Sequence, residues 1–175
     1  ACQHSGVKPD IMTSAKGLGS GMPIGAIIAR TTIMEQWKRG AHGNTFGGNP
    51  LSCAAAIATL DLVQSEYAAN AARVGEHFMG RLREMQRDYP CIGEVRGRGL
   101  MIGMELVEND AERTPARALC DRLVTRGYHN GLLLLACGVS TLRFMPPLST
   151  TIAEVDEAIG LLRNSLDEAL QGKGA

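Results

Sequence analysis

The chain has 175 residues, 45% of them hydrophobic, and its 18 basic and 18 acidic side chains balance to a formal net charge of zero. This length suffices for one ordinary domain or two small lobes. The balanced charge gives no broad field that would attract nucleic acid, and the longest strongly apolar run, 132–137, is too short to span a bilayer. Nothing at the amino end resembles a signal peptide, so we expect a cytoplasmic protein with neither nucleic acid nor membrane as a partner.

The five cysteines and four histidines are dispersed singly along the chain. None of them stands in the CxxC or HxxxH spacing that local metal ligands adopt. The cysteine total is odd, and no disulfide framework is suggested. We therefore expect reduced thiols and assign no metal.

The first part of the chain alternates between strand and helix signals. A short apolar run at 24–29 predicts a buried strand, and 32–39 predicts a short helix. Turn-forming residues then lead to Asn49 and Pro50, which are suited to cap and to open a long helix.

That helix is expected to run to about Tyr89, with a bend or break at 66–70. Its second half carries apolar residues at helical spacing, which predicts a face in the core. They are Ala71, Val74, Phe78, Leu82 and Met85.

The remainder of the chain predicts a small α+β lobe. One or two strands are expected over 94–106, a helix over 114–126, and strands over 132–137 and 141–144. A last helix begins at a capping box, a pair of reciprocal hydrogen bonds between a threonine and a glutamate three residues later. In this motif the side chain of each residue accepts a hydrogen bond from the backbone N–H of the other. The box is Thr151 with Glu154, and the apolar face of the helix is Ile152, Val155, Ile159, Leu162, Leu166 and Leu170.

Lys16 lies in a glycine-rich stretch, Ala15-Lys-Gly-Leu-Gly-Ser-Gly-Met-Pro-Ile-Gly-Ala26. A lysine amine among glycines and apolar residues is suited to form a Schiff base once it has lost its proton. The stretch fits neither the dinucleotide GxGxxG pattern nor a P-loop. On its own spacing, Lys16 fits a surface lysine that closes a glycine turn better than it fits a Schiff-base lysine.

Two further segments are candidates for ligand binding. Thr45 lies in a loop before the predicted helix start, where its hydroxyl and free backbone amides could hold a phosphate, although the loop also fits a simple helix cap. Arg143 is a single guanidinium in an apolar strand, suited to pair with a substrate carboxylate or to form a structural salt bridge.

Together these segments resemble the class III, fold-type I aminotransferases that use pyridoxal 5′-phosphate. The family pattern AKGLGxGxPIGA matches 15–26, TFxGNPxxCAAA matches 45–56, and LRFxPPL matches 142–148, in the expected order. The resemblance covers essentially the whole chain. It implies an α/β fold, made of the remainder of the large domain plus a small α+β carboxyl-terminal domain.

Residue by residue, the resemblance implies that Lys16 is the catalytic lysine, which forms the internal aldimine with pyridoxal phosphate and then shuttles the substrate proton. Thr45 is expected to bind the cofactor phosphate, typically in the neighbouring subunit, which implies a homodimer with a shared active site. Arg143 is expected to bind the substrate carboxylate.

The resemblance also implies a carboxyl-terminal portion of a longer enzyme. Residues 1–65 would be part of the large cofactor-binding domain, 66–89 a connecting helix, and 90–175 the small domain. The family aspartate that pairs with the pyridinium nitrogen, in a DEVQxGxGRTG segment, is absent from this sequence. We therefore expect the isolated fragment to be inactive.

Within the family, the segment 130–138 and the residues after Arg143 look most like 4-aminobutyrate aminotransferases, which pass an ω-amino group to 2-oxoglutarate by a ping-pong route. Acetylornithine, ornithine and diaminobutyrate aminotransferases and amino-acid racemases of the same fold remain alternatives, as does a non-catalytic truncated module. Arg96 and Arg98 are interpreted as structural residues of a glycine turn.

Overall fold

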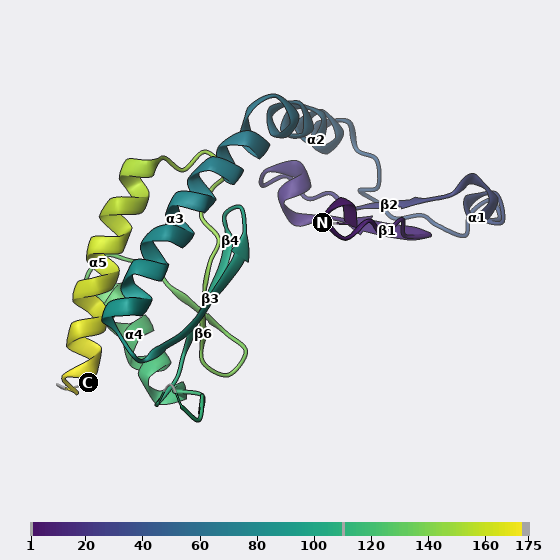
Figure 1. The fold of residues 1–175 in the computed structure, drawn as a ribbon. Helices are drawn as coiled ribbons and strands as arrows, with labels where there is room; N and C mark the ends of the chain where they lie inside the picture. Colours follow the sequence, from purple (N-terminus) through teal and green to yellow (C-terminus); the bar gives the residue numbers. More distant parts are fainter. Residues whose placement is uncertain (1, 110, 173–175) are drawn as a thin grey trace. The chain divides into compact units, whose positions relative to one another are not determined.

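The fold is that of a computed structural model, which describes residues 2–109 and 111–172 (Figure 1). The chain divides into two compact units, Ala1–Ser65 and Glu66–Ala175. Within the described residues, no helix combines the length and apolar character needed to cross a membrane.

The first unit is built around a two-stranded antiparallel sheet, in which Ile11 pairs with Ala29 and Ser14 with Ala26. Its elements are a 3₁₀ turn at Cys2–Ser5, β1 (Ile11–Ser14), a 3₁₀ turn η2 (Lys16–Gly19), β2 (Ala26–Ala29), α1 (Thr31–Met34) and α2 (Pro50–Leu62). The glycine-rich stretch is therefore the connection between the two strands.

The predicted helix over 32–39 is shorter in the structure, since α1 ends at Met34. Beyond it the chain continues in three-residue turns, in which the N–H of Trp37 donates to the carbonyl of Met34 at 3.1 Å. The Trp37 ring stacks on His42 with ring centroids 4.9 Å apart. This stacking draws the chain into a loop where the sequence alone suggested two helical turns.

The predicted helix start is confirmed. Asn49 Oδ1 accepts a hydrogen bond from the Ser52 N–H at 2.9 Å, and Pro50 occupies the first turn, where its missing N–H costs nothing. After α2 the chain passes through a π-helical segment, Val63–Tyr67, into α3 (Ala68–Asp88). The expected irregularity lies a few residues earlier than predicted, and it is a wider turn of helix rather than a break.

The second unit is a four-stranded antiparallel sheet in the order β3-β4-β6-β5, with its helices on one face (Figure 1). Helices α3 and α4 pack against the sheet, and α5 packs against both of them. The remaining elements are β3 (Ile92–Arg98), β4 (Met101–Leu106), α4 (Arg117–His129), β5 (Leu135–Cys137), β6 (Thr141–Phe144) and α5 (Ile152–Leu170).

The core of this unit lies between the helices and the inner face of the sheet. The predicted stripe on α3 is confirmed, since Val74, Leu82 and Met85 are fully buried. On α5 one expectation is wrong: Leu170 is 46% exposed, while Ala169 is buried. Ala169 follows the buried Leu166 by three residues, close to one helical turn of 3.6 residues, so it lies on the same face of the helix and points into the core.

Two predicted boundaries shift for local reasons. Helix α4 begins at Arg117 rather than 114, because Pro115 is still extended and bridges to Val107. Strand β5 begins at Leu135 rather than 132. The Leu132 N–H instead donates to the carbonyl of Gly127 at 2.7 Å, which satisfies the end of α4 before the chain enters the sheet.

The capping box at the start of α5 is present and predicts a pH dependence. Glu154 accepts hydrogen bonds from the backbone N–H and the hydroxyl of Thr151, at 2.7 and 2.8 Å, and these bonds lower the pKa of Glu154. Because folding lowers this pKa, the ionised carboxylate adds to the free energy of unfolding at pH values above the pKa of the unfolded state. This contribution is lost as the pH falls through the lower pKa of the folded state. We expect Glu154→Gln to remove this part of the acid sensitivity.

Thermal unfolding midpoints, followed from neutral to acidic pH, test this expectation. The control is Glu157→Gln, because Glu157 is exposed on the same helix outside the box. An identical acid dependence in the Glu154→Gln variant and in the unaltered chain would contradict the assignment.

Candidate active site

Lys16 lies where β1 ends and the glycine-rich turn begins. Ala15 is still extended, whereas Lys16 has φ of +55° and opens η2. This left-handed conformation is uncommon for a residue with a side chain, and it persists only where the surrounding structure imposes it. Such strain is frequent at functional sites.

The turn that imposes this conformation is held by contacts that do not involve the lysine side chain. The Leu18 N–H donates to the carbonyl of Ala15 at 3.2 Å. Gly19 is buried so closely against Ile24 that an added Cβ would lie 2.8 Å from its Cγ2. Beyond the turn, the Ser20 hydroxyl lies 3.0 Å from that of Thr59 on α2.

The Lys16 amine is exposed and makes no hydrogen bond or ion pair with any residue that the structure describes. It lines a pocket of about 410 Å³, whose other lining residues are Gly17, Gly21, Met22, Pro23 and Ile24. A free amine beside an open, partly apolar pocket has the chemistry to condense with an aldehyde.

Thr45 is exposed in the loop before α2, and its hydroxyl has no partner among the described residues. The loop is folded by backbone hydrogen bonds, such as that from the Gly47 N–H to the Asn44 carbonyl at 3.3 Å. Asn44 lines a pocket of about 520 Å³ together with Trp37 and His42. Lys16 lines a different pocket, so within the first unit the structure does not bring Lys16 and Thr45 together.

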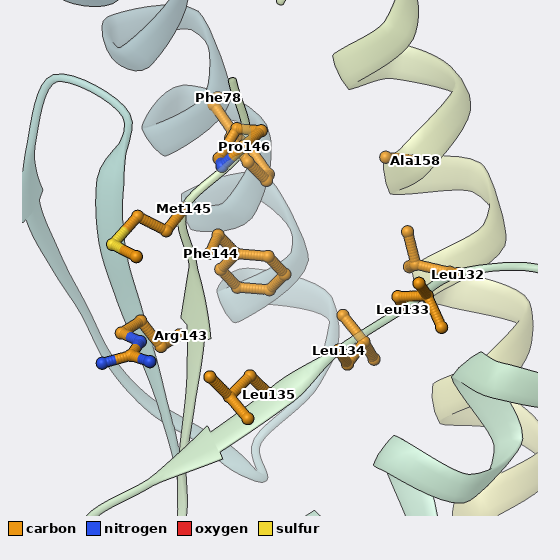
Figure 2. A pocket seen from close by; sticks show the side chains of 10 residues that line it. All are labelled: Phe78, Leu132, Leu133, Leu134, Leu135, Arg143, Phe144, Met145, Pro146 and Ala158. Atoms are coloured by element: carbon orange, nitrogen blue, oxygen red, sulfur yellow. The ribbon is translucent and has the colours of Figure 1, made fainter. Parts of the chain in front are cut away.

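Arg143 belongs to the second unit and lies on β6 with its side chain exposed. Its guanidinium forms no ion pair or side-chain hydrogen bond with the described residues, which argues against a structural salt bridge. Arg143 and Met145 lie on one side of the strand and the Phe144 ring on the other, as strand geometry requires (Figure 2).

A pocket of about 280 Å³ lies beside Arg143 at the edge of the sheet (Figure 2). Its walls are otherwise apolar, formed by Phe78, Leu132, Leu133, Leu134, Leu135, Phe144, Met145, Pro146 and Ala158. A lone guanidinium beside an aliphatic wall is suited to a carboxylate that carries an aliphatic body.

Sequence reasoning missed this pocket because the leucine run was interpreted as a strand. Only Leu135 joins β5, while the leucines before it line the pocket. The sequence signal that could have indicated the pocket was the Asn130-Gly131 pair. Gly131 has φ of +85° and marks where the chain turns before it reaches the sheet.

The cysteines offer no competing nucleophile in the second unit's core. Burial raises the pKa of the Cys120 thiol, and the neighbouring carboxylate of Asp121 raises it further. Burial also raises the pKa of Cys91. Both thiols therefore stay protonated near neutral pH, and no group of three or more potential metal ligands occurs among the described residues.

The family is defined by a direct comparison with known proteins. The family model described as aminotransferase class III matches residues 1–166. The chain therefore belongs to the class III aminotransferase family, whose cofactor is pyridoxal phosphate.

Individual relatives agree with this assignment. The chain is 42% identical over 167 residues to the acetylornithine aminotransferase of Caldanaerobacter subterraneus subsp. tengcongensis, covering 95% of the chain and 40% of the relative. It is 36% identical over 174 residues to the leucine/methionine racemase of Thermococcus litoralis, covering 99% of the chain and 39% of the relative.

A solved structure extends the agreement to the fold. The crystal structure of acetylornithine aminotransferase from Elizabethkingia anophelis superposes with a TM-score of 0.84 at 34% identity, over 96% of this chain and 41% of that one. The predicted α/β fold of the pyridoxal-phosphate-dependent transferases is thereby confirmed. The chain spans about two fifths of the length of these relatives.

Proposed function

We propose that this chain carries the catalytic lysine and a substrate arginine of a pyridoxal-phosphate-dependent aminotransferase that moves an amino group to 2-oxoglutarate. The single observation that carries the proposal is Lys16, an amine without partners on a strained turn beside an open pocket. The cofactor, when bound, supplies the electron sink that stabilises negative charge on the substrate carbon.

Each proposed residue has a separate task. The Lys16 Nζ would hold the cofactor through its aldehyde, and the same amine, when free, would serve as the base that moves the proton of the amine-bearing substrate carbon. The Thr45 hydroxyl donates a hydrogen bond to the cofactor phosphate. The Arg143 guanidinium binds the substrate carboxylate, and the apolar pocket beside it accommodates the aliphatic body of the substrate.

We propose acetylornithine as the first amino donor to test, ahead of 4-aminobutyrate. The support comes from two acetylornithine aminotransferases, one compared by sequence and one by structure. Both compounds present a primary amine at the end of an aliphatic chain that carries a carboxylate, so the chemistry at Lys16 and Arg143 is shared. The 4-aminobutyrate type remains the second donor to examine.

The domain assignment also remains a proposal. We propose that 1–65 is the carboxyl-terminal part of a large cofactor-binding domain, 66–89 a connecting helix and 90–175 a small domain. Large exposed apolar side chains on the first unit support a packing partner for it, because an isolated surface rarely exposes so many. Phe46 is 77% exposed beside Thr45, which supports the proposal that this loop contacts a second subunit of a homodimer.

The test is a substrate panel on the protein expressed from its whole reading frame and loaded with pyridoxal phosphate. Glutamate formed from 2-oxoglutarate is measured with acetylornithine, 4-aminobutyrate, ornithine and diaminobutyrate as donors. We expect the highest kcat/KM with acetylornithine. Amino transfer from 4-aminobutyrate but not from acetylornithine would reverse the order of donors, and no transfer from any donor would refute the aminotransferase proposal.

Racemisation is a second candidate, favoured by the Thermococcus relative and by the apolar pocket beside Arg143. A leucine or methionine side chain would fit an aliphatic wall, and its carboxylate would pair with the guanidinium. Chiral analysis of leucine after incubation, without any 2-oxo acid, separates the two activities. Conversion between the enantiomers without glutamate formation would favour the racemase.

A further inference from the structure

The loop 145–151 joins β6 to α5 in the second unit. Pro146 and Pro147 have no N–H to donate, so this loop has little backbone hydrogen bonding of its own. Within it, the Thr150 N–H donates to the carbonyl of Pro147 at 3.0 Å and closes a turn. The position of the loop therefore depends on contacts from other elements.

Asn70, in the first turn of α3, supplies such contacts. Its Nδ2 donates to the carbonyls of Leu148 and Thr150, at 2.7 and 3.0 Å. Its Oδ1 accepts a hydrogen bond from Nη2 of Arg73 at 2.8 Å. A guanidinium can only donate, so this bond sets the orientation of the amide, with its nitrogen toward the loop. Asn70 thereby ties the start of α3 to two carbonyls of the loop.

The tied loop forms part of the wall of the pocket beside Arg143. Pro146 lines this pocket together with Phe78 (Figure 2). Pro146 also lines a second pocket of about 260 Å³, together with Ser149 and Thr150. One loop borders both pockets, so a shift of the loop would change the space available in each.

Arg143 itself is held in a different way. It pairs with Gly103 of β4 and with Leu135 of β5, so its strand has a neighbour on each side. The sheet therefore positions the Arg143 backbone, whereas Asn70 positions the apolar wall that follows it in the chain. Loss of the Asn70 hydrogen bonds would move the wall and leave the arginine in place.

We propose that Asn70 is a positioning residue that sets the distance between Pro146 and Arg143, and thereby selects the length of the aliphatic body that a substrate carboxylate can carry. Asn70 acts through the loop and touches no substrate. Its two hydrogen bonds to backbone carbonyls hold the wall in one position, which favours the aliphatic chain that fills the pocket. The inference rests on the proposed carboxylate-binding role of Arg143.

The test measures the binding of two monocarboxylates, without turnover. Ligand-detected nuclear magnetic resonance follows acetate and pentanoate, which differ in the aliphatic chain, with the cofactor-loaded protein expressed from its whole reading frame. We expect the unaltered protein to bind pentanoate at least about tenfold more tightly, since each buried methylene adds affinity. Asn70→Asp keeps the size of the side chain but loses both N–H donors. It should raise the Kd for pentanoate about fivefold and leave that for acetate within about twofold.

Asn70→Ala adds no charge beside the carbonyls and should have the same effect, so the test does not depend on the folding of Asn70→Asp. The control is Gln86→Ala, because Gln86 lies on the same helix and its Nε2 likewise donates to a backbone carbonyl, that of Gly93 at 3.0 Å. It should change neither Kd. The inference is overturned if the unaltered protein does not prefer pentanoate, if the Asn70 variants change both affinities alike or neither, or if Gln86→Ala reduces the preference as much.

Two further measurements separate this inference from the proposed function. Arg143→Lys, which keeps the charge but loses the fork, should weaken both acids, and unchanged affinities would refute the carboxylate-binding role on which the inference rests. In steady state, Asn70→Asp should raise the KM for the amino donor and leave kcat within about twofold. Amino transfer together with an undiminished preference for pentanoate in the Asn70 variants would refute the inference alone. A protein that never transfers an amino group refutes the proposed function, whatever its affinity for either acid.

Discussion

Lys16→Ala is expected to lower amino transfer by at least about a thousandfold, because it removes the residue that we propose as both the covalent anchor of the cofactor and the base that moves the substrate proton. Lys16→Arg should be equally inactive, since a guanidinium keeps the positive charge but is never deprotonated. Loss of activity in Lys16→Arg would therefore show that position 16 needs a nucleophilic amine and not merely a positive charge.

The measurement is borohydride reduction of the cofactor-loaded protein, expressed from its whole reading frame, followed by mass mapping of the peptides. In the unaltered protein the pyridoxyl label should lie on the peptide that contains Lys16, and both variants should lack it. Lys8→Ala, which removes an exposed lysine upstream of β1, is the matched control and should keep label and activity. Label at another lysine would overturn the assignment.

Gly75→Ala is expected to be among the most destabilising small substitutions in the chain. Helix α3 crosses the turn between β3 and β4 so closely that a Cβ on Gly75 would lie 2.2 Å from the carbonyl oxygen of Gly99. The obstacle is backbone, which does not rotate away as a side chain would. We expect a loss of about 3 kcal/mol in the unfolding free energy of the second unit, in the upper range for overpacked cores.

Gly80 on the same helix provides the matched control, because a Cβ there would meet nothing within 4 Å. Gly80→Ala should stabilise the chain by up to about 1 kcal/mol, through the better helix propensity of alanine. Urea unfolding followed by far-ultraviolet circular dichroism measures both variants. Equal effects of the two substitutions would mean that α3 does not approach the turn as the structure describes.

Much of the second unit could be predicted because its local signals agree with one another. The stripe from Val74 to Met85 and the Thr151 capping box each depend on residues close together in the sequence. The predicted boundaries were wrong where a turn ends the element. Pro115 stays extended because it bridges to Val107, and the Leu132 N–H bonds back to Gly127. The apolar pattern from which the boundaries were predicted does not register either bond.

Less of the candidate site than of the second unit's fold could be predicted from the sequence. Family motifs single out Lys16, Thr45 and Arg143, but no motif describes what lies beside them. The left-handed backbone at Lys16 and the pocket beside Arg143 each follow from how the chain turns, at Lys16 itself and at Gly131.

The first unit buries very little of itself. Among residues 2–65, only Gly19, Ser52 and Ala56 are buried, and none of them has a large apolar side chain. Ordering a residue costs about 1–2 kcal/mol of backbone entropy, which so little burial does not offset. The larger cofactor-binding domain that we propose would supply the burial that this unit lacks around the turn at Lys16.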